Sequence, residues 1–167
     1  MKNDWFLFLA VATAIAGLTY YEGEAIMQTF TFATNATYKA LKPTIDMATA
    51  KYGLPPGLLD KLLYQESHYR PDIISGQTRS GVGAVGIAQF MPSTAASLGI
   101  DPLDPNQAIP GAARYLLQLY SSFHDWDLAV AAYNWGPGNV TSYLKGSKTP
   151  PSETTKYVAA ITGGSFA

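Results

Sequence analysis

Glu66 is one of only four glutamates in the chain, and it follows a run of leucines. Four residues recur at the spacing of one helical face: Leu59, Leu62, Leu63 and Glu66. A carboxyl group held among leucines is destabilised in its ionised form, which raises its pKa. Because a carboxyl that stays protonated near neutral pH can serve as a general acid, Glu66 is the candidate catalyst. A glutamate that is exposed or amide-paired at a helix end is the alternative.

A glycine-rich stretch runs from Gly81 to Gly86 and leads into residues 87–95. Glycines let a backbone pass close to a ligand, and Gln89 offers an amide donor and acceptor where such a ligand would lie. The stretch lacks the Gly-Lys-Ser/Thr ending of a phosphate-binding loop. It therefore indicates a binding loop of another kind, although glycine-rich loops have many uses.

A third group of residues lies just before Gly136. Trp126, Ala129 and Tyr133 share one helical face, so the ring of Tyr133 points inward, where its hydroxyl needs a partner. Asn134 follows at the predicted end of this helix. A core tyrosine beside a capping asparagine is the alternative to a functional pair.

The composition excludes several kinds of site. The chain has no cysteine and only two histidines, which excludes disulfides, cysteine nucleophiles, thiolate zinc sites and a histidine-rich metal centre. Eleven basic and twelve acidic residues give a net charge of −1, and this balance offers no basic stripe for nucleic acid. We therefore expect no metal, no cofactor and no nucleic-acid partner.

Short helices separated by glycine and proline are predicted from Pro43 onward, without a convincing β-hairpin. The expected helices cover residues 43–52, 57–68, 92–99, 105–123 and 125–135, then a short one ending at 144 and a last one reaching about 162. This pattern predicts a compact, mainly α domain over residues 43–167. Residues 25–42 lack a clean period and are interpreted as a linker.

An apolar segment lies near the amino terminus. Residues 5–21 carry no charge, and a helix of this length covers about 25 Å, near the lower limit for a membrane span. A lysine precedes the segment and two glutamates follow it, which predicts that the remainder is exported. We expect a hydrophobic helix that anchors residues 1–24 in a membrane. A cleaved signal peptide and a buried core helix are the alternatives.

Several short motifs occur in a fixed order. They are Gln65-Glu66-Ser67, Gly86-Ile87-Ala88-Gln89, Met91-Pro92-Ser93-Thr94-Ala95, Ala132-Tyr133-Asn134 and Gly136-Pro137-Gly138, flanked by residues 51–55 and 153–158. Together they resemble the soluble-lytic-transglycosylase family, whose catalytic domain is goose-lysozyme-like. The resemblance covers residues 43–162 and leaves residues 1–42 outside.

The resemblance implies cleavage of the β-1,4 bond between N-acetylmuramic acid and N-acetylglucosamine in peptidoglycan. It implies that Glu66 is the single catalytic acid and base, which first protonates the glycosidic oxygen. The resulting carboxylate then takes a proton from the muramyl C6 hydroxyl, which attacks C1 and leaves a 1,6-anhydro product. Tyr133 would lie close to Glu66, where its hydroxyl orients the carboxyl.

The same resemblance implies which residues contact the sugars. Ser67, Gln89 and Asn134 would hydrogen bond to them, and Tyr157 would line the groove. At residues 87–88 the chain has Ile-Ala where the family usually has Leu-Met.

The missing methionine leaves that subsite open, and Phe90 or Met91 would fill it. Trp135 would either stack on a sugar or pack internally, and His68 would face solvent.

Two alternatives remain. A hydrolytic muramidase would need a second carboxylate facing Glu66, and Asp72 and Glu153 are the candidates. A non-catalytic wall-binding module or a structural virion protein would not depend on Glu66. Two settings suit local opening of a cell wall: a phage virion, especially one with an internal membrane, and a bacterial secretion or conjugation apparatus.

Overall fold

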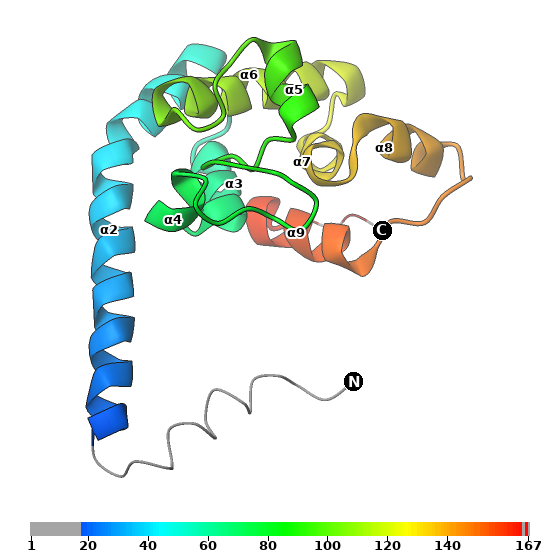
Figure 1. Ribbon diagram of the computed structural model, residues 1–167. Coiled ribbons are helices and arrows are strands. Elements are labelled where there is room, and N and C mark those ends of the chain that lie inside the picture. Colours follow the sequence, from blue (N-terminus) through cyan, green and yellow to red (C-terminus); the bar gives the residue numbers. More distant parts are fainter. Residues whose placement is uncertain (1–17, 165, 167) are drawn as a thin grey trace.

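The chain is mainly helical, as predicted (Figure 1). The computed structural model describes residues 18–164 and 166. In this part of the chain the helices are α2 (Leu18–Tyr52), α3 (Leu58–Ser67), α4 (Pro71–Ile74), α5 (Pro92–Leu98), α6 (Pro105–Phe123), α7 (Trp126–Trp135), α8 (Pro137–Leu144) and α9 (Ser152–Thr162). One isolated antiparallel bridge, between Val85 and Phe90, is the β-structure recorded among these residues.

The helices predicted after Gly53 are confirmed, with small shifts at their ends. Their boundaries follow local chemistry. Proline occupies the first turn of α5, α6 and α8, where its missing N–H costs nothing. The side chains of Asp104 and Asp125 accept hydrogen bonds from backbone N–H groups at the starts of α6 and α7. The four-residue helix α4 was not predicted, because it is too short to show a period.

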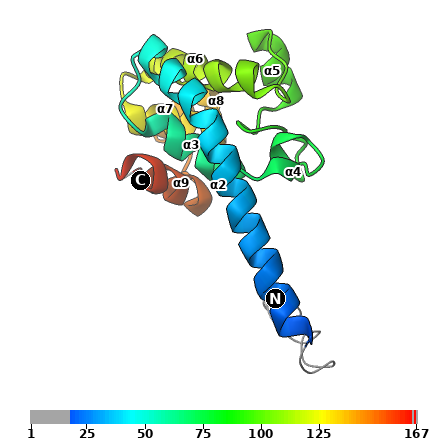
Figure 2. The same ribbon diagram turned by 90° about the vertical axis from the view of Figure 1, so that its left-hand side faces the viewer.

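The prediction for residues 25–52 was wrong in one respect. A helix was expected to begin at Pro43 after an irregular stretch, whereas α2 runs unbroken from Leu18 to Tyr52 with Pro43 inside it. Packing outweighs the hydrogen bond lost at the proline. Ile45 and Ala48 are buried, and α2 packs against α6. Figure 2 shows the first half of α2 standing clear of the other helices.

Most of the apolar amino-terminal segment, residues 5–17, lies outside the described residues. Only its last four positions, 18–21, fall within α2. Among the helices that the structure describes, none combines the length and the apolar character that a membrane crossing requires.

The core forms around α7, which packs against α6, α8 and α9. Ala129, Val130, Ala131 and Ala132 have no exposed surface, and such small side chains let neighbouring helices approach closely. On α3, Leu59, Leu62 and Leu63 are completely buried, which confirms the predicted apolar face. Because α3 packs against α9, that face directs the end of α3 toward α9 (Figure 1).

Candidate active site

Glu66 lies in the last turn of α3, above the buried leucines. Burial removes water from its carboxyl group and raises the pKa to about 7, although a hydrogen bond from Tyr157 opposes part of this rise. At neutral pH a substantial fraction of the carboxyl is therefore protonated. The carboxyl can donate a proton in one step and accept one in the next, as acid–base catalysis requires.

Tyr157 is the tyrosine that contacts this carboxyl. It lies buried on α9, and its hydroxyl donates a hydrogen bond to Oε1 of Glu66. Burial and the nearby Glu66 charge hold the pKa of Tyr157 well above its usual value, so its proton stays available for donation. The family resemblance predicted that Tyr133 would orient the carboxyl and that Tyr157 would line the groove. In the structure, Tyr157 makes the bond to the carboxyl.

Tyr133 instead connects the site to the glycine-rich loop. Its hydroxyl donates a hydrogen bond of 2.8 Å to the carbonyl oxygen of Ala88. Its pKa is raised by burial first and by the Glu66 charge second, which places it in the electrostatic neighbourhood of the carboxyl. Its ring packs against Phe90 and Tyr115, with centroids 5.9 and 5.5 Å apart. Tyr133 thereby holds the loop beside Glu66.

The loop itself is held in one conformation by its backbone. Gly86 has a φ of +78°, and a Cβ atom there would lie 1.9 Å from the carbonyl oxygen of Pro102. The amide of Gln89 donates a hydrogen bond of 2.8 Å from Nε2 to the Gly86 carbonyl. Val85 and Phe90 exchange two backbone hydrogen bonds of 3.1 Å across this turn. A glycine is thus required at position 86, and Gln89 is fixed by the turn that it closes.

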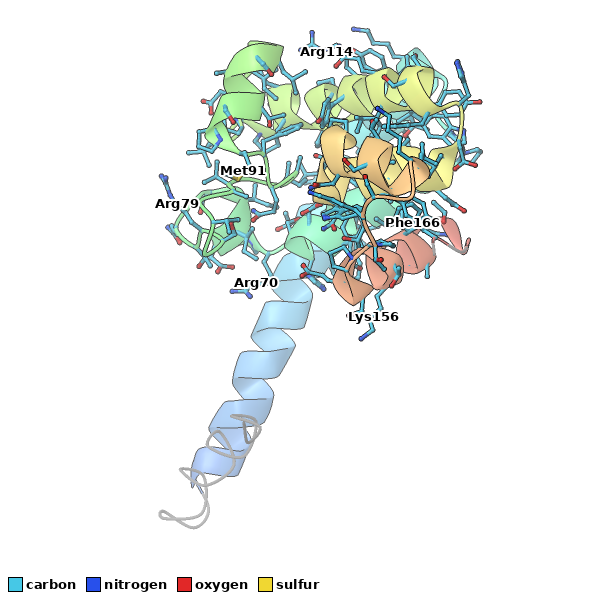
Figure 3. All side chains as sticks on the ribbon, turned by 90° about the vertical axis from the view of Figure 1, so that its right-hand side faces the viewer. Arg70, Arg79, Met91, Arg114, Lys156 and Phe166 are labelled. Carbon is cyan, nitrogen blue, oxygen red and sulfur yellow. The ribbon has the colours of Figure 1, made fainter. Side chains whose placement is uncertain are left out.

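The predicted sugar-contacting residues differ in their access to solvent. Met91 is 40% exposed and lies at the surface between α5 and the glycine-rich loop (Figure 3). Phe90 is only 2% exposed and belongs to the aromatic cluster with Tyr115 and Tyr133. Of the two candidates for the missing methionine, Met91 is therefore the accessible one.

Ser67 and Asn134 also differ from each other. Ser67 is fully buried, its hydroxyl donates to the Leu63 carbonyl, and its oxygen accepts from the backbone N–H of Tyr69. Ser67 was predicted to bind sugars. In the structure its hydroxyl instead makes both of these hydrogen bonds within the protein, at the end of α3. Asn134 is exposed, and its Oδ1 accepts a hydrogen bond of 2.8 Å from Thr154, a buried residue that the sequence analysis missed.

Asp72 and Glu153, the candidates for the second carboxylate of a hydrolase, have surroundings that differ from those of Glu66. Asp72 accepts hydrogen bonds from Arg70 and Thr78, and these lower its pKa. Glu153 is exposed in the first turn of α9. His68 is exposed, as predicted, and Trp135 is half-buried. The described residues contain no group of three or more potential metal ligands.

Comparisons with known proteins identify the family to which this chain is similar. The model of the family described as transglycosylase SLT domain matches residues 43–155. A transglycosylase of Enterobacteria phage PRD1 is 36% identical over 123 residues, which cover 73% of this chain and 44% of the phage protein. A membrane-bound lytic murein transglycosylase F of Alkalilimnicola ehrlichii is 39% identical over 103 residues, covering 57% and 22%. This chain thus spans less than half the length of these relatives.

Solved structures of two lytic transglycosylases share the fold. The 70 kDa soluble lytic transglycosylase of Escherichia coli superposes with a TM-score of 0.62 at 29% identity, over 72% of this chain and 22% of that one. An inactive mutant of the lytic transglycosylase Slt of Pseudomonas aeruginosa gives a TM-score of 0.60 at 30% identity, with the same coverage.

Proposed function

We propose that this chain, which belongs to the family of transglycosylase SLT domains, is a lytic transglycosylase of peptidoglycan. The reaction would cleave the β-1,4 bond between N-acetylmuramic acid and N-acetylglucosamine and leave a 1,6-anhydro end. One observation carries the proposal. Glu66 is a half-buried carboxyl with a pKa of about 7, supported by a tyrosine hydroxyl and placed beside an accessible loop.

The first step uses the protonated form of Glu66. The carboxyl gives its proton to the glycosidic oxygen, the C1–O bond breaks, and the substrate N-acetyl group stabilises the cationic sugar. The hydrogen bond from Tyr157 to Oε1 leaves the other oxygen, Oε2, to carry the proton toward the substrate. The same bond fixes the orientation of the carboxyl at the moment of transfer.

The second step uses the carboxylate that remains. It takes the proton of the muramyl C6 hydroxyl while that oxygen attacks C1, so Glu66 is protonated again and no water is consumed. This sequence needs one carboxyl, and a hydrolase needs a second. The engagement of Asp72 by Arg70 and Thr78, together with the exposure of Glu153, favours the non-hydrolytic route.

The glycan would lie along the glycine-rich loop. Three of the predicted sugar-binding residues are partly or fully accessible: Gln89, Met91 and Asn134. They lie next to the hydrogen bond between Tyr133 and Ala88, which joins their segments near Glu66. Met91 would cover an apolar sugar face, and the amides of Gln89 and Asn134 would bind polar substituents. Ser67 and Phe90 would act indirectly, by ending α3 and supporting the loop.

The setting is a proposal of the same kind. The similarity to a phage transglycosylase supports a virion that opens the wall during entry, and the similarity to membrane-bound relatives supports an anchored enzyme on the periplasmic side. The uncharged residues 5–21 would supply the anchor. Detergent partitioning of the intact protein tests this. Recovery in the aqueous phase would contradict an anchor.

The catalytic assignment is tested by Glu66→Gln in a turbidity assay on purified peptidoglycan. We expect loss of about 100-fold or more, because an amide cannot supply the proton. Glu153→Gln is the matched control, since it removes the charge of an exposed glutamate and should leave lysis unchanged. Wall lysis by the Glu66 variant at the wild-type rate would show that Glu66 is not the catalyst, whereas no lysis by the wild type would favour a non-catalytic wall-binding protein.

A further inference from the structure

A hydrogen-bonded network joins α2 to the first turn of α3 and to the residue Tyr69 beyond its end. The hydroxyl of Tyr38, on α2, donates to Oδ2 of Asp60 over 2.9 Å. The hydroxyl of Tyr69 lies 2.6 Å from Oδ1 of the same carboxylate and 2.9 Å from the Asp60 carbonyl oxygen. Each carboxylate oxygen of Asp60 therefore receives one tyrosine hydroxyl, one from α2 and one from the turn that follows α3.

The network ends on the turn that directly follows Glu66. His68 and Tyr69 both have positive φ, 50° and 54°, and two such residues in succession are unusual without glycine. A backbone in this region persists only where its surroundings hold it. Tyr69 is held at both ends, because its N–H donates to Ser67 and its hydroxyl reaches Asp60.

Tyr38 brings a separate helix into this support. Its ring lies 4.9 Å from the ring of Tyr69, centroid to centroid, in addition to the bond to Asp60. Position 38 precedes residues 43–155, which the family model matches, so this contact belongs to the part of α2 that leads into the domain. The contact packs that part of the helix against the turn after Glu66.

We propose that Tyr38 is a positioning residue for Glu66, which acts by fixing Asp60 and Tyr69 and thereby the turn at the end of α3. The inference rests on the proposed function of Glu66. The part of α2 that precedes residue 43 would then support the active site, although the sequence indicated only a linker there. A displacement of α2 would then change the rate of the reaction.

The test is Tyr38→Phe, which keeps the ring and removes only the hydroxyl. We expect kcat to fall about five- to tenfold with KM within about twofold, because a slightly misplaced acid slows chemistry more than binding. Tyr64→Phe is the matched control: this tyrosine is half exposed, its ring also lies near Tyr69, and no hydroxyl contact links it to Asp60. Equal kcat values in both variants would overturn the proposal.

A second measurement does not depend on activity. The chain has only four glutamates, so carbon-13 NMR of labelled side chains can follow the Glu66 carboxyl, assigned with Glu66→Gln. In Tyr38→Phe we expect its pKa to fall toward the ordinary glutamate value, as the looser turn admits water. An unchanged titration overturns the positioning role. If the wild type were inactive on peptidoglycan but the Glu66 titration still shifted in Tyr38→Phe, only the proposed function would be contradicted.

The double variant separates positioning from general stability. Tyr38 and Tyr69 both act through Asp60, so Tyr38→Phe combined with Tyr69→Phe should lower kcat by clearly less than the product of the single effects. Multiplying effects would show that the two tyrosines act independently, which contradicts a shared route through Asp60.

Discussion

Tyr157 donates a hydrogen bond to Glu66 across 91 residues of sequence, from the buried face of α9 to the last turn of α3. This bond gives the carboxyl an orientation and opposes part of the rise in its pKa. The pKa of the Glu66 carboxyl therefore depends on two opposing effects. Burial raises it, the hydrogen bond from Tyr157 lowers it, and each effect can be changed separately.

Tyr157→Phe removes the influence that lowers the Glu66 pKa. The acid must be protonated to act, so wild-type kcat/KM should fall as the pH rises through about 7. In the variant this alkaline limb should move to higher pH, while the maximal rate falls because the carboxyl loses its fixed orientation. A pH–rate profile measures both effects. A limb that moves to lower pH would contradict the pKa-lowering effect of the Tyr157 hydrogen bond.

Glu66→Gln should stabilise the protein in alkaline solution. The folded pKa of about 7 lies above the ordinary glutamate value of 4.5, so the native state holds the extra proton and the wild type loses stability as the pH rises between these values. The amide avoids this loss and should gain about 2 to 3 kcal/mol at about pH 8 and almost nothing at about pH 4. Urea unfolding at the two pH values measures the difference. A gain independent of pH would contradict the burial of this carboxyl.

Ser67→Ala should act on stability rather than on sugar binding. It removes two buried hydrogen bonds at the end of α3, and we expect a loss of about 1 to 3 kcal/mol. KM should stay close to the wild-type value, because the hydroxyl has no exposed surface. Thermal unfolding and steady-state kinetics separate the two. A large rise in KM without loss of stability would instead support the predicted hydrogen bond from Ser67 to the sugar.

Gly86→Ala should disrupt the loop beside the site. Both the positive φ and the approach of the Pro102 carbonyl oppose a side chain, and we expect a cost of about 3 kcal/mol or more. Gly81→Ala is the control, since a Cβ there meets nothing within 4 Å and its φ is not positive. Similar unfolding midpoints for the two variants would contradict this account of the turn.

Local pattern predicted much of the fold and the position of the acid. The spacing of Leu59, Leu62 and Leu63 sufficed to place Glu66 on a buried face, because helical periodicity is a local property. The helix through Pro43 was not predictable in the same way. Proline normally marks a helix start, and the buried contacts of Ile45 and Ala48 that outweigh it come from distant helices.

The partners of the site residues were harder to predict. The bond from Tyr157 to Glu66 depends on how α9 packs against α3, and no sequence spacing encodes it. Ser67 shows the same limit at short range, since a serine at a helix end can face solvent or bond to the carbonyl four residues earlier. The structure selects the second arrangement.

The products released from purified peptidoglycan test the central claim most directly. The intact protein is incubated with the polymer in water enriched in heavy oxygen, and the muropeptides are analysed by mass spectrometry with the Glu66→Gln variant as the blank. The account predicts fragments that end in 1,6-anhydro-muramic acid and carry no heavy oxygen, because the C6 hydroxyl is the nucleophile. Reducing ends that contain heavy oxygen would contradict it and identify a hydrolase.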